Sequence, residues 1–260
     1  ERAAILERLT DSAEYKQLGQ HANGLRKAAD AHLASLEQEL ALLKRILPAG
    51  LRMGRMHWGG GTPTILPPEL IHRLAQAVKA VIPPTGDWEF SVEIDPTMVD
   101  RHKIAALAAE GMNRASLGIQ DFDSKVQNAI GRLQPFDVTR HCVEDLRAAG
   151  IQSLNADLVY GLPHQDITRL DDTVSKVLDL APDRIALFGY AHVPWMSKRQ
   201  RLIDEKSLPK EVERFHLAEY AIAASGLIIS PNLMTGWPVP WRQGGCGEIF
   251  KDMWMIAAPP

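Results

Sequence analysis

The chain has 260 residues, 45% of them hydrophobic, which suits one large domain or two smaller ones. Lys and Arg total 29 against 32 for Asp and Glu, so the chain has no strong positive field to attract nucleic acid or acidic lipid. No apolar run reaches the roughly 18 residues of a membrane span, and the charged first residues lack a signal-peptide core; we therefore expect a cytoplasmic protein without nucleic-acid or membrane partners.

Helix-like and strand-like segments alternate along most of the chain. Apolar residues recur at helical spacing over 31–47, a strand-like stretch follows at 54–58, and a second helix is expected over 67–82. The same order then repeats, with strands expected at 88–94, 113–120, 153–161 and 183–190, and helices expected at 101–111, 124–131, 138–150, 168–180 and 210–226. Five strand-then-helix units without a hairpin signal predict an α/β fold with a parallel sheet and outer helices. The pattern leaves open whether the sheet is doubly wound or a barrel, and both place a ligand at the carboxyl ends of the strands.

Polar residues gather where these strands are expected to end. They are the glycine run of HWGGGTPT (57–64), Glu93 with Asp95, Gln120 with Asp121, Asp157, and Tyr190 with His192. Carboxylates, an amide, hydroxyls and bare backbone suit a ligand that carries an ammonium, a ribose and a carboxylate. Neither a GxxxxGK[ST] nor a GxGxxG motif occurs, so the glycine run is not a usual phosphate-binding loop.

Each of these features also has a structural interpretation. The sequence GGGTP can be a plain strand-to-helix turn, and Glu93 and Asp95, which precede Pro96, can cap a helix. Asp157 favours a function, because a carboxylate in an otherwise apolar strand costs free energy unless it is paired or faces a ligand. The histidines lack a second ligand at metal-binding spacing, and the two cysteines, Cys142 and Cys246, are isolated. We therefore assign no metal ligand and no disulfide.

Six motifs in order carry a resemblance to a known family. HWGGGTPT, VEIDP, LGIQDFD, AIGRLQP, DLVYGLPHQ and FGYAHVP closely resemble the oxygen-independent coproporphyrinogen III oxidases, which are radical S-adenosylmethionine (SAM) enzymes. The likeness extends from about Ala31 to about Gly226, and the tracts QDFDSKVQNAIGRLQPFDVT and FGYAHVP resemble the oxidase more than the related radical SAM haem chaperone. It implies that residues 31–226 form a partial (βα)6-type radical SAM barrel, with parallel strands inside and helices outside.

The resemblance also implies cofactors, a substrate and a site. The family uses S-adenosylmethionine and a [4Fe-4S] cluster, which an electron donor reduces. With them it carries out the oxidative decarboxylation of coproporphyrinogen III to protoporphyrinogen IX in haem biosynthesis. By similarity, the main chain of the glycine motif would receive the methionine ammonium, and the other matching residues would surround the cofactor. These cofactor-binding candidates are Gly60, Gly61, Thr62, Glu93, Gln120, Arg132, Asp157 and Ala191. We expect a monomer.

Two segments depart from the family. The family's CxxxCxxCxC motif, whose thiolates hold the cluster, has no counterpart in the unrecognised segment 1–30, so we expect the chain as written to be inactive. The alternative is a non-catalytic protein that binds SAM or a porphyrin on the same barrel, as a haem chaperone does. Residues 227–260 are irregular, and a shifted reading frame can encode a family-like NFQGY there. We therefore expect this tail to be the product of a frameshift.

Overall fold

The computed structural model describes residues 34–196 and 199–224. The chain divides into two compact units, one formed by residues 1–53 with 73–86 and the other by residues 54–72 with 87–260. The expectations for segments 1–30 and 227–260 lie outside the described residues, as does Cys246. The expected helix over 31–47 is helical at 34–46.

The first unit contains a paired guanidinium and carboxylate. Arg73 of α3 (Pro68–Val81) donates from Nε and Nη2 to the two carboxylate oxygens of Glu37, at 2.7 and 2.8 Å. This bidentate hydrogen bond lowers the pKa of the Glu37 carboxyl below its usual value. Both side chains are partly exposed, so the pair adds little to stability.

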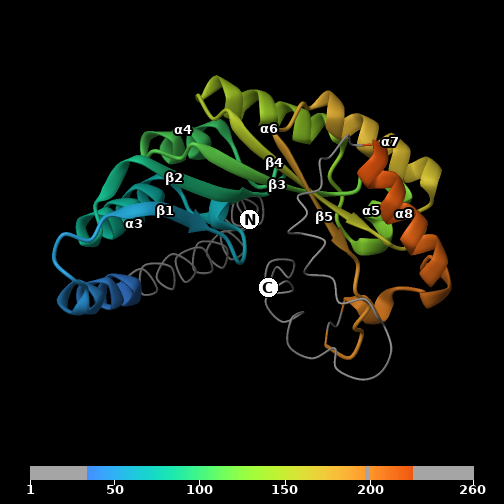
Figure 1. Ribbon diagram of the computed structural model, residues 1–260, viewed down its shortest axis with the longest axis horizontal. Helices are drawn as coiled ribbons and strands as arrows, with labels where there is room; N and C mark the ends of the chain where they lie inside the picture. Colours follow the sequence, from blue (N-terminus) through green and yellow to red (C-terminus); the bar gives the residue numbers. More distant parts are fainter. Residues whose placement is uncertain (1–33, 197–198, 225–260) are drawn as a thin grey trace, which may run out of the picture. The chain divides into compact units, whose positions relative to one another are not determined.

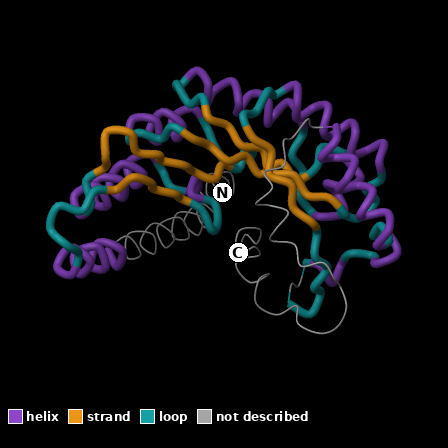
Figure 2. Tube along the Cα trace, viewed as in Figure 1, coloured by secondary structure: helices purple, strands orange, loops and turns teal. Residues whose placement is uncertain are grey.

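One five-stranded sheet lies in the second unit, apart from Met53 and residues 84–86, which belong to the first unit (Figures 1 and 2). Its strands are β1 (Met53–Trp58), β2 (Pro84–Ile94), β3 (Arg114–Gln120), β4 (Ser153–Tyr160) and β5 (Arg184–Gly189), in the spatial order β1-β2-β3-β4-β5. The β2–β3, β3–β4 and β4–β5 pairs are parallel. All five expected strands are therefore confirmed, and β2 begins earlier than the sequence pattern predicted.

At least one helix follows each of the strands β2 to β5, and capping side chains fix several helix starts. These helices are α4 (Arg101–Ala109), α5 (Ser124–Ile130), α6 (Phe136–Ala148), α7 (Ile167–Asp179) and α8 (Glu211–Ala224). Asp100, Asp123 and Asp166 are the N-caps of α4, α5 and α7, and each carboxylate accepts hydrogen bonds from main-chain N–H groups of the first turn. Short 3-10 helices, which the sequence pattern did not predict, occur at Pro63–Ile65, Gln200–Leu202 and Glu205–Ser207.

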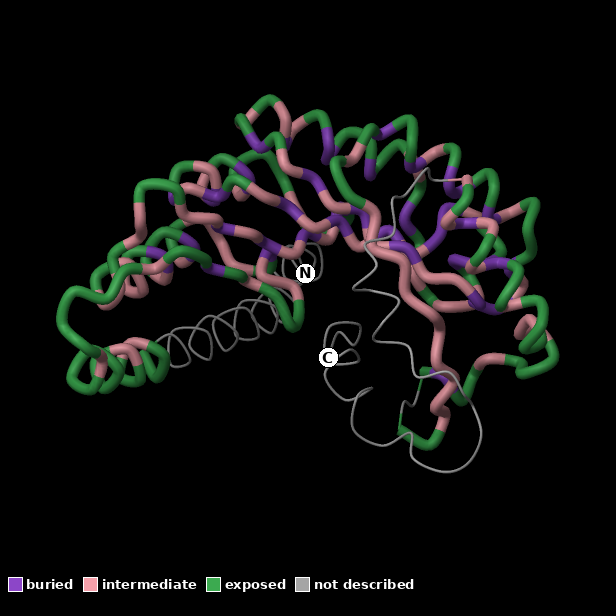
Figure 3. Tube along the Cα trace, in the orientation of Figure 1, coloured by how far each residue is buried: buried purple, intermediate pink, exposed green. Residues whose placement is uncertain are grey.

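Side chains of the central strands alternate between an apolar and a polar face. On β3 every second residue, starting at Ala115, is buried, and the same alternation occurs on β4 from Leu154 (Figure 3). Figure 1 shows α4, α6 and α7 on one face of the sheet, which curves away from them. A parallel sheet that curls with helices outside is a half-barrel and not a doubly wound sheet, which decides the alternative that the sequence left open.

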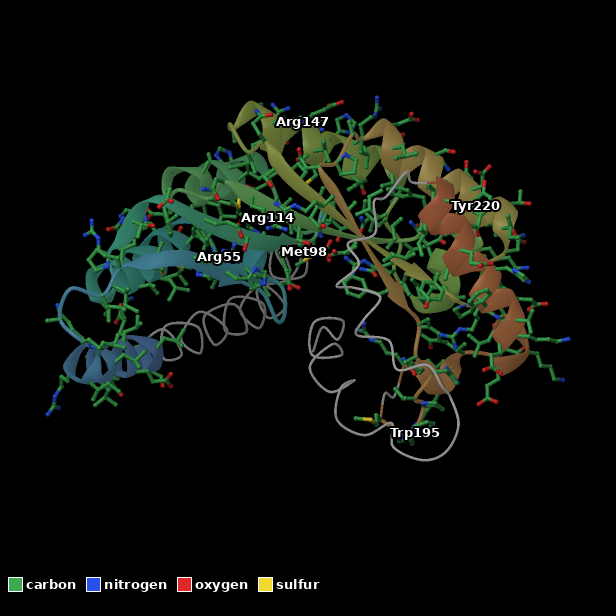
Figure 4. The ribbon with its side chains drawn as sticks, in the orientation of Figure 1. Arg55, Met98, Arg114, Arg147, Trp195 and Tyr220 are labelled. Atoms are coloured by element: carbon green, nitrogen blue, oxygen red, sulfur yellow. The ribbon has the colours of Figure 1, made fainter. Side chains whose placement is uncertain are left out.

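The inner face of the half-barrel is polar along its length. At its amino-terminal end, Arg114 of β3, labelled in Figure 4, donates to Glu89 of β2 at 3.3 Å. In the middle, Asn155 of β4 donates to Ser116 Oγ of β3 at 2.8 Å. This polar face leads to the carboxyl ends of the strands, where the candidate residues lie.

Candidate functional site

The carboxyl ends of the strands carry the polar residues that the sequence singled out; we call this set the rim. It comprises Gly59–Thr62 after β1, Glu93 and Asp95 at the end of β2, Gln120 at the end of β3, Asp157 in β4 and Ala191 after β5, with Arg132 after α5. All of these residues belong to the second unit. A single edge of one sheet therefore carries the eight cofactor-binding candidates, whereas Asp121, next to Gln120, is fully buried.

The glycine loop lies directly against a carboxylate. Gly60 donates its main-chain N–H to Glu93 Oε2 at 3.2 Å, and its φ of 78° is one that glycine tolerates without strain. A Cβ on Gly59 would lie 2.5 Å from Glu93 Oε1 and 2.5 Å from His57 Nε2. The missing side chain at Gly59 is thus what allows Glu93 and His57, 3.5 Å apart, to meet beside the loop.

Asp157 is held by two neighbours on the polar face. Its Oδ2 accepts from Ser116 Oγ at 2.9 Å and its Oδ1 from Asn155 Nδ2 at 2.7 Å. Burial raises the pKa of the Asp157 carboxyl, and the nearby Glu93 adds to the rise, while these hydrogen bonds and Arg132 oppose it. Two carboxylates and one guanidinium therefore act on one another at the rim.

The end of β3 holds Gln120 and Arg132 next to a glycine. Arg132 Nη2 donates to the carbonyl oxygen of Gly118 at 2.9 Å and lies 3.5 Å from Asp95 Oδ2. A Cβ on Gly118 would lie 3.1 Å from Arg132 Nη2 and 3.2 Å from Gln120 Nε2. A side chain at this position would crowd both groups, so glycine favours their close approach to the strand.

The segment after β5 is fixed by a buried amide. Gln200 accepts from the Val193 N–H at 2.5 Å and donates to the Ala191 carbonyl oxygen at 3.1 Å. Its side chain spans the residues that follow the strand, and only 6% of Gln200 is exposed. Ala191 therefore takes part in the rim through its main chain.

Contacts connect the candidates to different extents. Direct hydrogen bonds or ion pairs join Gly60 to Glu93 and Arg132 to Asp95, and electrostatic interactions join Glu93 and Arg132 to Asp157. A Cβ at Gly61 would meet no atom within 4 Å, so this position borders open space. Thr62 precedes the 3-10 helix Pro63–Ile65, and its carbonyl oxygen accepts from the Ile65 N–H at 2.9 Å.

The sequence analysis missed three residues that support the site. Ser116 and Asn155 lie two positions before Gly118 and Asp157 on the same face of their strands, so the two-residue period of a strand could have found them. Gln200 stands in a segment without periodicity, and no sequence signal marks it.

The cysteine in the described part of the chain, Cys142, lies in α6. Cys142 is buried, with 5% of its surface exposed. Burial raises the pKa of its thiol to about 12, with contributions from Asp145 and Asp95. Within residues 34–196 and 199–224, no group of three or more His, Cys, Asp and Glu side chains is arranged to hold a metal ion.

Comparison with known proteins identifies the fold family. Residues 18–177 match the family model for the radical SAM superfamily. The chain belongs to the radical SAM superfamily. In the part of this radical SAM chain that the structure describes, no helix is long and apolar enough to cross a bilayer.

Curated relatives are coproporphyrinogen III oxidases. The chain is 66% identical over 192 residues to coproporphyrinogen III oxidase, anaerobic 1, of Cereibacter sphaeroides. The aligned residues make up 74% of this chain and 42% of the relative. It is 51% identical over 191 residues to the oxygen-independent coproporphyrinogen III oxidase of Paracoccus denitrificans, with the same coverage. The radical SAM chain thus spans less than half the length of these relatives.

Solved structures agree with the barrel. Coproporphyrinogen III oxidase from Escherichia coli, reported as a radical SAM enzyme, superposes with a TM-score of 0.72 at 36% identity, over 75% of this chain and 45% of that one. An Elp3 protein from Methanocaldococcus infernus gives a TM-score of 0.52 at 16% identity, over 64% of this chain and 44% of that one. The second likeness concerns the fold alone.

Proposed function

We propose that this chain is the SAM-binding barrel core of an oxygen-independent coproporphyrinogen III oxidase. The observation that carries the proposal is the meeting of Glu93, Asp157 and Arg132 at the rim of a radical SAM barrel. The 66% identity over 192 residues to the Cereibacter sphaeroides coproporphyrinogen III oxidase supports the choice of substrate within that superfamily.

The donor set of the rim fits S-adenosylmethionine. Glu93, beside the Gly60 N–H, suits the methionine ammonium, and Arg132 suits the methionine carboxylate. Asp157 suits ribose hydroxyls, because its carboxylate can accept further hydrogen bonds. The residues that would hold the cofactor are therefore Gly60, Gly61, Thr62, Glu93, Gln120, Arg132, Asp157 and Ala191. Bound there, S-adenosylmethionine would supply the radical chemistry of the superfamily, and the protein would orient it and exclude water.

The donor set does not fit a [4Fe-4S] cluster. Three thiolates are needed by resemblance, but the 260 residues contain two cysteines. Cys142 is buried in α6, with a thiol pKa of about 12, so it stays protonated at neutral pH and is a poor ligand. We therefore propose that the chain as given does not convert coproporphyrinogen III to protoporphyrinogen IX.

The cysteine count favours a second candidate function. A barrel that keeps the carboxylate and guanidinium rim without the thiolates can bind S-adenosylmethionine or a porphyrin without radical chemistry. Such a non-catalytic protein would resemble the haem chaperones related to the oxidase.

Anaerobic reconstitution with iron and sulfide separates these proposals. We expect no brown four-iron absorbance and no protoporphyrinogen formation above a control without protein, while calorimetry detects S-adenosylmethionine binding. A four-iron spectrum with turnover would show that the chain is an active oxidase. Absence of S-adenosylmethionine binding would reject the proposed cofactor site in both candidates.

A further inference from the structure

A buried carboxylate lies directly behind the rim. Asp121 follows Gln120 in the chain, and none of its surface is exposed. Its Oδ1 accepts from the Asp123 N–H at 2.6 Å and from Thr173 Oγ1 at 3.0 Å, and its Oδ2 accepts from Gln165 Nε2 at 2.6 Å. The carboxylate thereby joins the connection after β3 to α7 and to the connection after β4.

This carboxylate anchors a strained turn at Gln120. The Asp121 N–H donates to the Ile119 carbonyl oxygen at 2.9 Å, which closes a three-residue turn with Gln120 at its centre. Gln120 has a φ of 68°, and the β3–β4 register shifts between Gly118 and Gln120. Such a turn is rare for a residue with a side chain and persists only where its surroundings determine it. The hydrogen bonds to the Asp121 carboxylate fix the main chain in this turn.

The main chain of Asp121 extends the same network to Arg132. Its carbonyl oxygen accepts from Gln127 Nε2 at 2.8 Å, and the Gln127 amide also bonds the Gln134 carbonyl oxygen and N–H, at 2.7 and 3.0 Å. Gln134 Oε1 in turn accepts from Arg132 Nε at 3.3 Å. The side chains of Gln127 and Gln134 are buried, so the arrangement has little freedom to relax.

Stability alone does not account for a carboxylate at this place. Burial raises the pKa of the Asp121 carboxyl, against the opposing effect of its hydrogen bonds. A buried charge costs free energy, and well-packed neutral replacements are often equally stable. The network that the carboxylate builds leads instead to two rim residues, Gln120 and Arg132.

We infer that Asp121 is a positioning residue, which holds Gln120 and Arg132 in the geometry that receives S-adenosylmethionine. It does not itself border the open space of the rim. This inference rests on the proposed function for its ligand, and on the contacts of Asp121 for its mechanism.

The test compares Asp121→Asn with a matched Asp183→Asn control. Asp183 Oδ2 also accepts from a main-chain N–H, that of Leu154 at 2.8 Å, but it precedes β5 at the opposite end of the sheet. We expect Asp121→Asn to weaken S-adenosylmethionine binding at least ten-fold by calorimetry, at a temperature where all variants are folded. The Asp183→Asn control should change the affinity for S-adenosylmethionine less than two-fold. Hydrogen exchange of residues 118–134 should become at least ten-fold faster in Asp121→Asn only.

A double variant provides a rescue that a general loss of stability would not give. In Asp121→Asn with Gln165→Glu, the asparagine amide can donate to the new carboxylate, which still accepts from the Gly161 N–H that Gln165 Oε1 binds at 2.6 Å. The rescue is partial, because the carboxylate loses the hydrogen bond that Gln165 Nε2 donates to the Val159 carbonyl oxygen at 3.0 Å. We expect at least a three-fold recovery of affinity over Asp121→Asn alone. Affinity and exchange equal to those of the Asp183→Asn control would overturn the inference. If the unsubstituted chain fails to bind S-adenosylmethionine, the cofactor proposal fails, and the exchange rates of residues 118–134 still decide whether Asp121 fixes this segment.

Discussion

Glu93 and Gly60 are joined by a hydrogen bond of 3.2 Å from the glycine N–H to Glu93 Oε2. A carboxylate has acceptor capacity for several donors, so the same group can receive an ammonium while it holds the glycine loop. The bond joins the end of β2 to the loop after β1, so the two segments form one continuous surface.

Gly59→Ala should weaken cofactor binding through Glu93. The new Cβ would lie 2.5 Å from Glu93 Oε1 and from His57 Nε2, so the carboxylate must move. We expect the S-adenosylmethionine dissociation constant to rise about ten-fold, equivalent to about 1.4 kcal/mol, by calorimetry. Gly54→Ala on β1 is the control, because its Cβ would meet no atom within 4 Å. Equal affinities in the two variants would contradict the role of Glu93.

Gly61→Val should block the ligand without disturbing the fold. No atom lies within 4 Å of a Cβ at Gly61, so the valine side chain would enter open space at the rim. We expect an unchanged helical circular dichroism spectrum and no detectable S-adenosylmethionine binding by calorimetry. Retained binding would exclude Gly61 from the site.

Asp157→Asn should reveal the cost of burying a carboxylate. The pKa of the Asp157 carboxyl is raised in the folded chain above its value in the unfolded chain. At pH values between these two pKa values the folded chain binds more protons than the unfolded chain, so the stability of the fold falls there as pH rises. Asparagine lacks this titration. Urea unfolding should therefore show the unsubstituted chain losing stability relative to the variant as pH rises from about 4, and the difference should then level off. A pH-independent difference would speak against the raised pKa.

Cys142 should be almost inert in the folded chain. Its thiol is buried and has a pKa of about 12, so the reactive thiolate is scarce at pH 8. In a Cys246→Ser background, we expect its reaction with a disulfide reagent to be about a hundred-fold slower in buffer than in denaturing urea. Comparable rates in the two conditions would show that the thiol is accessible.

The central strands β3 and β4 and the helix α7 were predictable because each has a clear period. The alternation at Ala115 and Leu117 and the helical spacing over 168–180 are local properties of the chain. The position of the rim residues at one edge could be predicted because parallel strands end at one edge, whereas the cofactor proposed for them came from the resemblance. The pairing of Glu93 with Gly60, and of Arg132 with Gly118, depends on tertiary geometry that one sequence does not contain.

The supporting residues were harder to predict for the same physical reason. Gln200 reaches back to Ala191 from an irregular segment, and its role depends on which main-chain groups happen to lie nearby. The short 3-10 helices have no sustained period, so the sequence pattern could not reveal them.

The left-handed backbone of Gln120 also makes this position a point of conflict for protein engineering. Glycine would accept a φ of 68° more readily than glutamine does, so selection for thermal resistance alone would favour losing the amide side chain. A stabilised variant obtained that way would have less backbone strain at this position, but it would lack a side chain of the proposed cofactor site. Stability and ligand recognition therefore favour different residues at this one position.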